Sequence, residues 1–120
     1  MAAWSDFVGA TQVSDIQGKF SALLSAVDCE SVIQATAMPG SGLGVFRALV
    51  EAKPRLPPRF RDLVGTLQRR MALAQYGDGE ACAGVRTAII GGGPVGLRCA
   101  VELALLGSSV TVIEGRSSWT

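Results

Sequence analysis

A run of glycines stands between two short β-branched segments of this sequence and limits the folds that it can adopt. Residues 85–90 read VRTAII, residues 91–96 read GGGPVG, and residues 109–113 read SVTVI. β-Branched residues favour strands, and short apolar strands of this kind are typical of a parallel sheet that is buried on both faces. A glycine-rich turn that leaves such a strand and opens a helix is the start of a dinucleotide-binding βαβ unit. The stretch from Arg86 to Arg116 therefore predicts a βαβ unit that binds the ADP part of a nucleotide.

Three glycines of this turn follow the spacing G-x-G-x-x-G, and each has a separate physical task. Gly91 permits the tight turn off the strand, because a side chain there would obstruct the backbone. Gly93 lets the main chain approach a pyrophosphate, and Gly96 lets the following helix lie close to the strand. Pro94 suits the first helical turn, where its missing N–H costs little.

The helix is expected to run to about Leu106, with Gly107 ending it in left-handed backbone. Its N-terminus carries free amides and roughly half a positive charge, which favours a bound pyrophosphate. The second strand ends at Glu114, 18 residues after Gly96. An acid at that position accepts hydrogen bonds from the adenosine ribose hydroxyls and repels a 2′-phosphate, so FAD or NAD(H) is favoured over NADP(H).

The part that precedes this unit is predicted to be helical. Apolar residues recur at helical spacing over residues 14–27 and 59–75, and two further helical stretches are expected at residues 30–37 and 42–52. Ser14 and Asp15 are candidate caps, three prolines at 54, 57 and 58 break the pattern, and Gly77-Asp78-Gly79 forms a turn. We expect a helical subdomain at residues 1–80 and the start of the βαβ unit at residues 84–120. The predicted class is α/β, with an incomplete Rossmann-like fold that indicates a truncated chain.

Composition excludes several classes of function. The net charge is +1, so no broad surface for nucleic acid is expected, and the basic residues between Lys53 and Arg70 are interpreted as a solvated helix face. The chain has no histidine, which removes most hydrolase and zinc chemistry, and its three cysteines have no metal-ligand spacing. No signal peptide and no membrane span are expected, which favours a cytoplasmic protein.

A longer pattern connects this turn to a family. From Gly91 to Glu114 the sequence follows G-x-G-P-x-G-L-x-x-A-x-x-L-x-x-x-G-x-x-V-x-V-x-E and is similar to the fingerprint of FAD-dependent hydroxylase-type monooxygenases. This similarity favours FAD over NAD. Segments 81–84, 93–98, 101–107 and 112–116 resemble the monooxygenase domain of the MICAL family. Residues 28–32 and 46–57 look like the N-terminal helices of the same family.

The resemblance implies an FAD enzyme that uses NADPH and oxygen to oxidise methionine side chains of actin, with a cytoplasmic, cytoskeleton-associated location. Two positions depart from the family, since Val95 stands where it usually has Cys and Gly115 where it usually has Lys. Neither change should abolish binding, because the first contact is largely made by the main chain. No residue is predicted to be catalytic, because the family's later segments lie beyond Thr120. The expected cofactor-binding residues are Gly91, Gly93, Val95, Gly96, Glu114, Gly115 and Arg116.

Two alternatives remain open on the sequence alone. The chain could be a truncated, non-catalytic product whose helical part serves as an interaction module, or the start of an NAD-binding dehydrogenase. Arg116 could pair with the pyrophosphate or be solvated. Arg98 and Glu102 are expected to form a surface pair, since they stand four residues apart on one helix.

Overall fold

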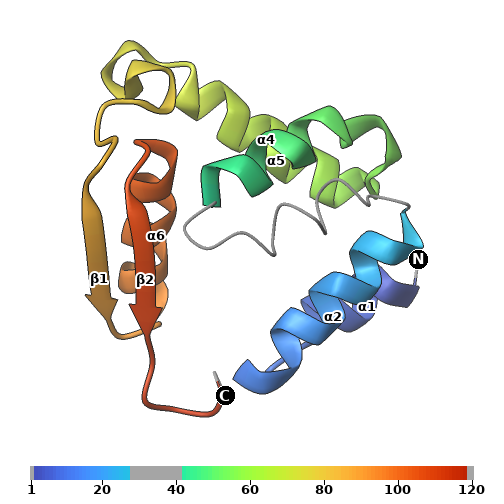
Figure 1. Ribbon diagram of the computed structural model, residues 1–120. Coiled ribbons are helices and arrows are strands. Elements are labelled where there is room, and N and C mark those ends of the chain that lie inside the picture. Colours follow the sequence, from blue (N-terminus) through green and yellow to red (C-terminus); the bar gives the residue numbers. More distant parts are fainter. Residues whose placement is uncertain (1, 28–41, 119–120) are drawn as a thin grey trace.

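The computed structural model describes residues 2–27 and 42–118. The predicted helix at residues 30–37 lies outside these ranges. In Figure 1 the helices come first along the chain and the two strands with their connecting helix come last. The elements are α1 (Ala2–Val8), α2 (Val13–Ala26), α4 (Gly42–Glu51), η1 (Lys53–Arg55), α5 (Pro58–Met71), η2 (Ala74–Gly79), β1 (Arg86–Ile90), α6 (Pro94–Leu105) and β2 (Ser109–Ile113).

The βαβ unit is confirmed. Strands β1 and β2 pair in parallel, with Arg86 opposite Ser109 and Ile90 opposite Ile113. Helix α6 connects the two strands and begins at Pro94, as expected for proline in a first helical turn. Gly107 follows the helix in left-handed backbone, with φ at 95°. The α/β class and the order of its elements are therefore those that the sequence predicts.

The helical part agrees with the predicted pattern but differs at several ends. Helix α2 begins at Val13 and Gln12 is its N-cap, with no capping hydrogen bond from the Gln12 side chain, so the prediction that Ser14 and Asp15 cap it is wrong. Both residues already lie inside the first helical turn. Helix α1 was not predicted, because its seven residues are too few for a clear periodic pattern.

Helix α5 ends at Met71, four residues before the predicted end at Gln75. Leu73 takes extended backbone, with φ at −65° and ψ at 143°, and therefore interrupts the helix. The residues from Gly77 to Gly79 all have positive φ, which explains the turn expected there. Asp78 is the non-glycine member, and aspartate tolerates this conformation better than most residues do.

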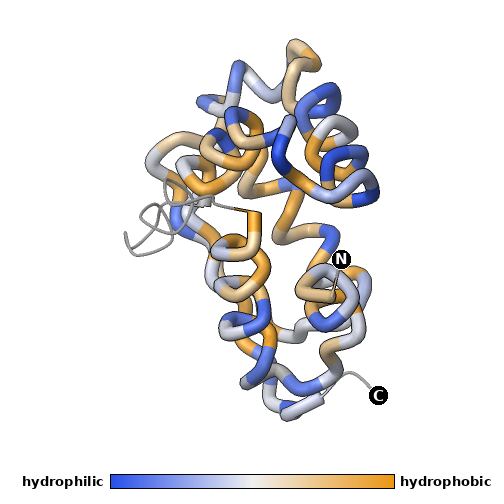
Figure 2. Tube along the Cα trace, turned by 90° about the vertical axis from the view of Figure 1, so that its right-hand side faces the viewer, coloured by the Kyte–Doolittle hydropathy of each residue, from blue (hydrophilic) through white to orange (hydrophobic). Residues whose placement is uncertain are grey.

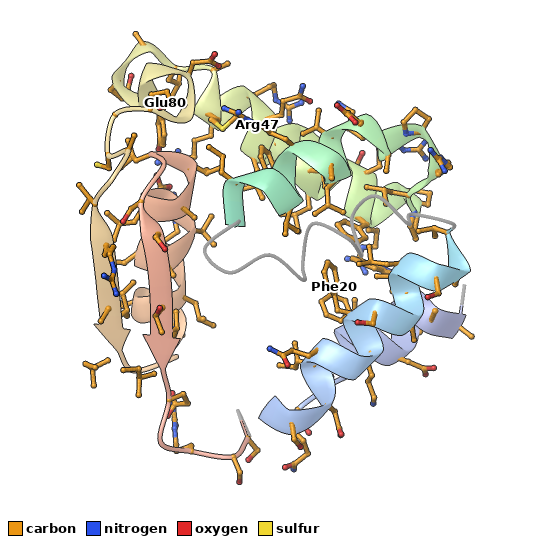
Figure 3. All side chains as sticks on the ribbon, viewed as in Figure 1. Phe20, Arg47 and Glu80 are labelled. Carbon is orange, nitrogen blue, oxygen red and sulfur yellow. The ribbon has the colours of Figure 1, made fainter. Side chains whose placement is uncertain are left out.

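The principal core lies among the helices. Leu23 and Leu24 of α2 and Val64 of α5 are almost completely buried. Phe20 points from α2 toward the other helices in Figure 3, and its ring lies 5.4 Å from that of Phe7. In Figure 2 hydrophobic and hydrophilic residues alternate along the helical segments, as expected for helices with one buried face. The buried cluster consists of Leu23, Leu24, Val27, Leu49, Ala52, Leu56, Phe60 and Val64.

The expectation that the first strand is buried on both faces is wrong for this chain. Helix α6 covers one face of the two strands in Figure 1, and the described residues place nothing over the other face. Consequently Ile90 is 79% exposed and Ile113 is 52% exposed. The apolar composition of the strand suits a wider sheet with helices on both sides, whereas in the described ranges α6 is the single helix that connects the strands and covers them.

The described part of the chain contains neither a membrane-spanning helix nor a cluster of metal-ligand side chains. None of its helices is both long and apolar enough to cross a membrane. Within the same residues, no group of three or more metal-ligand side chains comes together.

A pair of leucine substitutions tests the helical core. Leu24→Ala removes a side chain that is 1% exposed, and we expect the free energy of unfolding to fall by about 3 kcal/mol. Leu63→Ala is the matched control, because Leu63 is 52% exposed on α5 and its loss should change stability by less than about 0.5 kcal/mol. Urea denaturation measures both values. Equal losses in the two variants would contradict the placement of the core.

Candidate nucleotide-binding site

The turn after β1 depends on Gly91. Its φ of 107° lies in a region that residues with a side chain rarely adopt. Its N–H donates to the carbonyl of Ile113 at 2.7 Å, which extends the parallel ladder by one bond beyond the strands. The turn therefore leaves the sheet at the carboxyl ends of both strands, where ligands bind in open α/β sheets.

Gly96 sits where helix and turn approach most closely. A Cβ built on it would lie 2.2 Å from the carbonyl oxygen of Gly91 and 3.4 Å from Cγ2 of Ile89. The first distance is far below any van der Waals contact, so no other residue fits without moving α6 away from the turn. The close packing that the sequence assigned to Gly96 is present.

Gly93 is the N-cap of α6 and has open space in front of it. A Cβ at this position would meet no atom within 4 Å, and its φ of −74° is accessible to any residue. The fold of the described chain therefore does not require glycine here. The helix places its first amides and its positive end beside this space, which is favourable for an anion such as pyrophosphate.

The carboxylate of Glu114 connects the two loops that border this space. Its Oε2 accepts the N–H of Gly92 at 2.7 Å, and its Oε1 accepts the N–H of Arg116 at 3.0 Å. The Arg116 guanidinium lies 3.4 Å from the same oxygen. Hydrogen bonds from the backbone of Arg116 and Gly92 lower the pKa of Glu114 to about 2. Glu114 is therefore ionised at neutral pH, and its side chain is only 12% exposed.

The seven predicted site residues follow directly after β1 or β2 in the chain, and the carboxyl ends of these two strands lie side by side (Figure 1). Val95 is 78% exposed in the first turn of α6, and Gly115 is exposed between Glu114 and Arg116. Sequence reasoning missed Gly92, a buried residue whose amide fixes the Glu114 carboxylate. Its position as the second residue of the glycine motif was the available signal.

The residues present fit the ADP half of a dinucleotide. A helix N-terminus faces open space beside Gly93, and an ionised acid stands at the end of the adjacent strand. A guanidinium with a 65% exposed side chain, that of Arg116, is next to this acid. Amides and a guanidinium suit phosphate oxygens, and a carboxylate suits ribose hydroxyls. The arrangement has the geometry that nucleotide-binding βαβ units share.

The class of protein follows from comparison with a known family. Residues 40–120 match the family model described as pyridine nucleotide-disulphide oxidoreductase, and the chain belongs to this family. The matched region includes α4, α5 and the whole βαβ unit. The family membership therefore agrees with the fold of the βαβ unit.

The chain is also similar to individual proteins that are named [F-actin]-monooxygenases. The chain is 36% identical over 109 residues to the [F-actin]-monooxygenase mical2b of Danio rerio, which covers 84% of this chain and 6% of the relative. It is 32% identical over 120 residues to the [F-actin]-monooxygenase MICAL1 of Bos taurus, covering 99% of this chain and 10% of the relative. The resemblance to the MICAL flavoprotein monooxygenases is confirmed. The chain spans about a tenth or less of the length of these relatives.

The low pKa of Glu114 predicts that the stability of the folded chain depends on pH. Because the folded chain holds this carboxylate at a pKa of about 2 and the usual value is 4.5, the unfolded chain takes up the proton first as the pH falls. The stabilisation by Glu114 is therefore complete above about pH 4.5 and is lost on approaching pH 2. We expect the urea midpoint of Glu114→Gln to lie below that of the wild type at pH 7, with the difference shrinking between pH 4.5 and 2.

The control for this experiment is Glu51→Gln, which changes an exposed carboxylate of α4 and should leave the midpoint close to that of the wild type. A deficit in Glu114→Gln that stays the same from pH 7 to pH 2 would show that packing, and not charge, accounts for the loss.

Proposed function

We propose that this chain binds FAD through the ADP half of the cofactor and forms part of a flavoprotein monooxygenase that uses NADPH and acts on F-actin. The observation that carries the proposal is the Glu114 carboxylate, which is held ionised between the glycine turn and the 114–116 segment. The names of the relatives as [F-actin]-monooxygenases support the choice of reaction and of partner.

Each site residue has a role that follows from its place. Gly91, Gly93 and Gly96 shape the turn, so that the amides at the start of α6, including that of Val95, donate to the pyrophosphate. Glu114 accepts hydrogen bonds from the adenosine ribose hydroxyls. Gly115 has no side chain that would obstruct the cofactor as it approaches the 114–116 segment. Arg116, which lies beside Glu114, neutralises charge on the phosphates.

These roles concern cofactor binding and not the redox chemistry. FAD supplies the redox chemistry when bound, while the residues described here bind and orient its ADP half. The acid at position 114 disfavours a 2′-phosphate, so we assign NADPH to a site other than this one. An enzyme that acts on F-actin works in the cytoplasm beside the cytoskeleton, and we propose that location for this one.

A substitution at Gly93 separates binding from folding. Gly93→Ala should lower stability by less than about 1 kcal/mol, because the position is open and its backbone is ordinary. The added methyl group stands where the pyrophosphate approaches, so the Kd for FAD should rise about tenfold or more, which corresponds to the loss of one charge-assisted hydrogen bond. Isothermal titration with FAD, ADP, NADH and NADPH measures the effect and the order of preference.

Gly18→Ala is the matched control, because this glycine of α2 also has no atom within 4 Å of a Cβ position and lies in the helical part. It should leave the Kd for FAD unchanged. Binding of NADH in preference to FAD would favour a dehydrogenase instead. An unchanged Kd for FAD in Gly93→Ala would show that the pyrophosphate does not bind at this turn.

A further inference from the structure

A cluster of polar side chains joins the helical part of the chain to α6. The carboxylate of Glu102, on α6, accepts a hydrogen bond from Nε of Arg70 at 2.5 Å and another from the hydroxyl of Tyr76. Arg98, on the same helix, donates to the same carboxylate at 3.1 Å. The expected surface pair of Arg98 and Glu102 is therefore present. It belongs to a larger cluster whose side chains come from α5, η2 and α6.

The cluster is partly shielded from water. Tyr76 is 5% exposed, and the side chain of Glu102 is 23% exposed. The hydrogen bond from the Tyr76 hydroxyl, aided by Arg70, lowers the pKa of Glu102. Glu102 is therefore ionised at neutral pH, and a charged acceptor of this kind makes stronger hydrogen bonds than a neutral one.

The same end of α6 is held at further points. The N–H of Cys82 donates to the carbonyl of Leu106 at 2.7 Å, and a Cβ on Gly107 would lie 2.1 Å from the carbonyl oxygen of Gly79. The η2 segment is itself held by α4, because Arg47, labelled in Figure 3, donates to the carbonyl of Asp78 at 3.2 Å. The residues before β1 therefore contact the C-terminal half of α6 and the turn after it through side-chain hydrogen bonds, a backbone hydrogen bond and close packing.

The opposite end of α6 forms the nucleotide site. Glu102 stands eight residues after Pro94, so about 12 Å of helix separates the cluster from the helix N-terminus. On the other side α6 packs against β1 and β2, which form the sheet of the described residues, and Leu105 is its buried hydrophobic side chain. A change in how the cluster holds the helix would tilt or shift the amides that face the pyrophosphate.

We propose that Tyr76, Arg70 and Glu102 are positioning residues for the nucleotide site, which set the place of α6 and thereby the affinity for the ADP group. The proposal rests on the proposed function, because it concerns the same site. Since coupling between two sites is reciprocal, a nucleotide at the helix N-terminus must also tighten the contact between η2 and α6.

Affinity measurements on three variants test this coupling. Tyr76→Phe removes one hydroxyl and Glu102→Gln removes the charge at nearly constant shape, while Arg98→Ala is the control, because Arg98 reaches the same carboxylate from the same helix. The Kd for ADP is measured by titration at a temperature where circular dichroism shows each variant folded. We expect Tyr76→Phe and Glu102→Gln to raise the Kd at least about threefold, and Arg98→Ala to leave it unchanged.

Hydrogen exchange supplies a readout that a purely structural role would not change. Saturation of the wild type with ADP should slow exchange of the Cys82 amide, which bonds to Leu106 of α6, and the slowing should be smaller in Tyr76→Phe. Variants that lose thermal stability but keep the Kd for ADP would overturn the inference. An equal loss of affinity in Arg98→Ala would also overturn it. A wild type that binds neither ADP nor FAD would instead remove the proposed function.

Discussion

The missing side chain at Gly96 allows α6 to lie so close to the turn after β1 that a Cβ would stand 2.2 Å from the carbonyl oxygen of Gly91. This contact brings the positive end of the helix to the carboxyl ends of both strands. Glu114 then completes the arrangement, because its carboxylate binds the amides of Gly92 and Arg116 and so keeps the two loops together. The geometry of the site follows from the close approach at Gly96 and from the Glu114 carboxylate, which is only 12% exposed.

The two parts of the chain contribute unequally to this arrangement. The helices share an extensive core around Leu23, Leu24 and Val64, whereas Leu105 is the buried hydrophobic side chain of residues 86–113. Ser108, also buried there, is satisfied by the carbonyl of Val85 and the hydroxyl of Thr87. A parallel sheet of two strands with one helix buries little apolar surface. The contacts of η2 and α5 with α6 therefore stabilise the unit that carries the site.

The sequence predicted what depends on local physics. β-Branching marked the strands, and the glycine spacing with Glu114 marked the site, because each reflects steric or charge requirements of neighbouring residues. It did not predict the cluster of Glu102, Tyr76 and Arg70, since partners 26 and 32 residues apart meet only through the packing of whole helices. It also predicted burial on both faces of β1, because strand composition reflects a wider sheet than the one present.

In the proposed function, the turn at Gly91–Gly96 and the 114–116 segment together bind an adenine dinucleotide. Titration of ADP into ¹⁵N-labelled protein, followed through the chemical shifts of backbone amides, measures this binding residue by residue. We expect the largest changes at Gly92, Gly93, Val95 and Arg116, with little change in α1 and α2. Changes concentrated in the helical part, or none at the glycine turn under saturating ADP, would contradict the account.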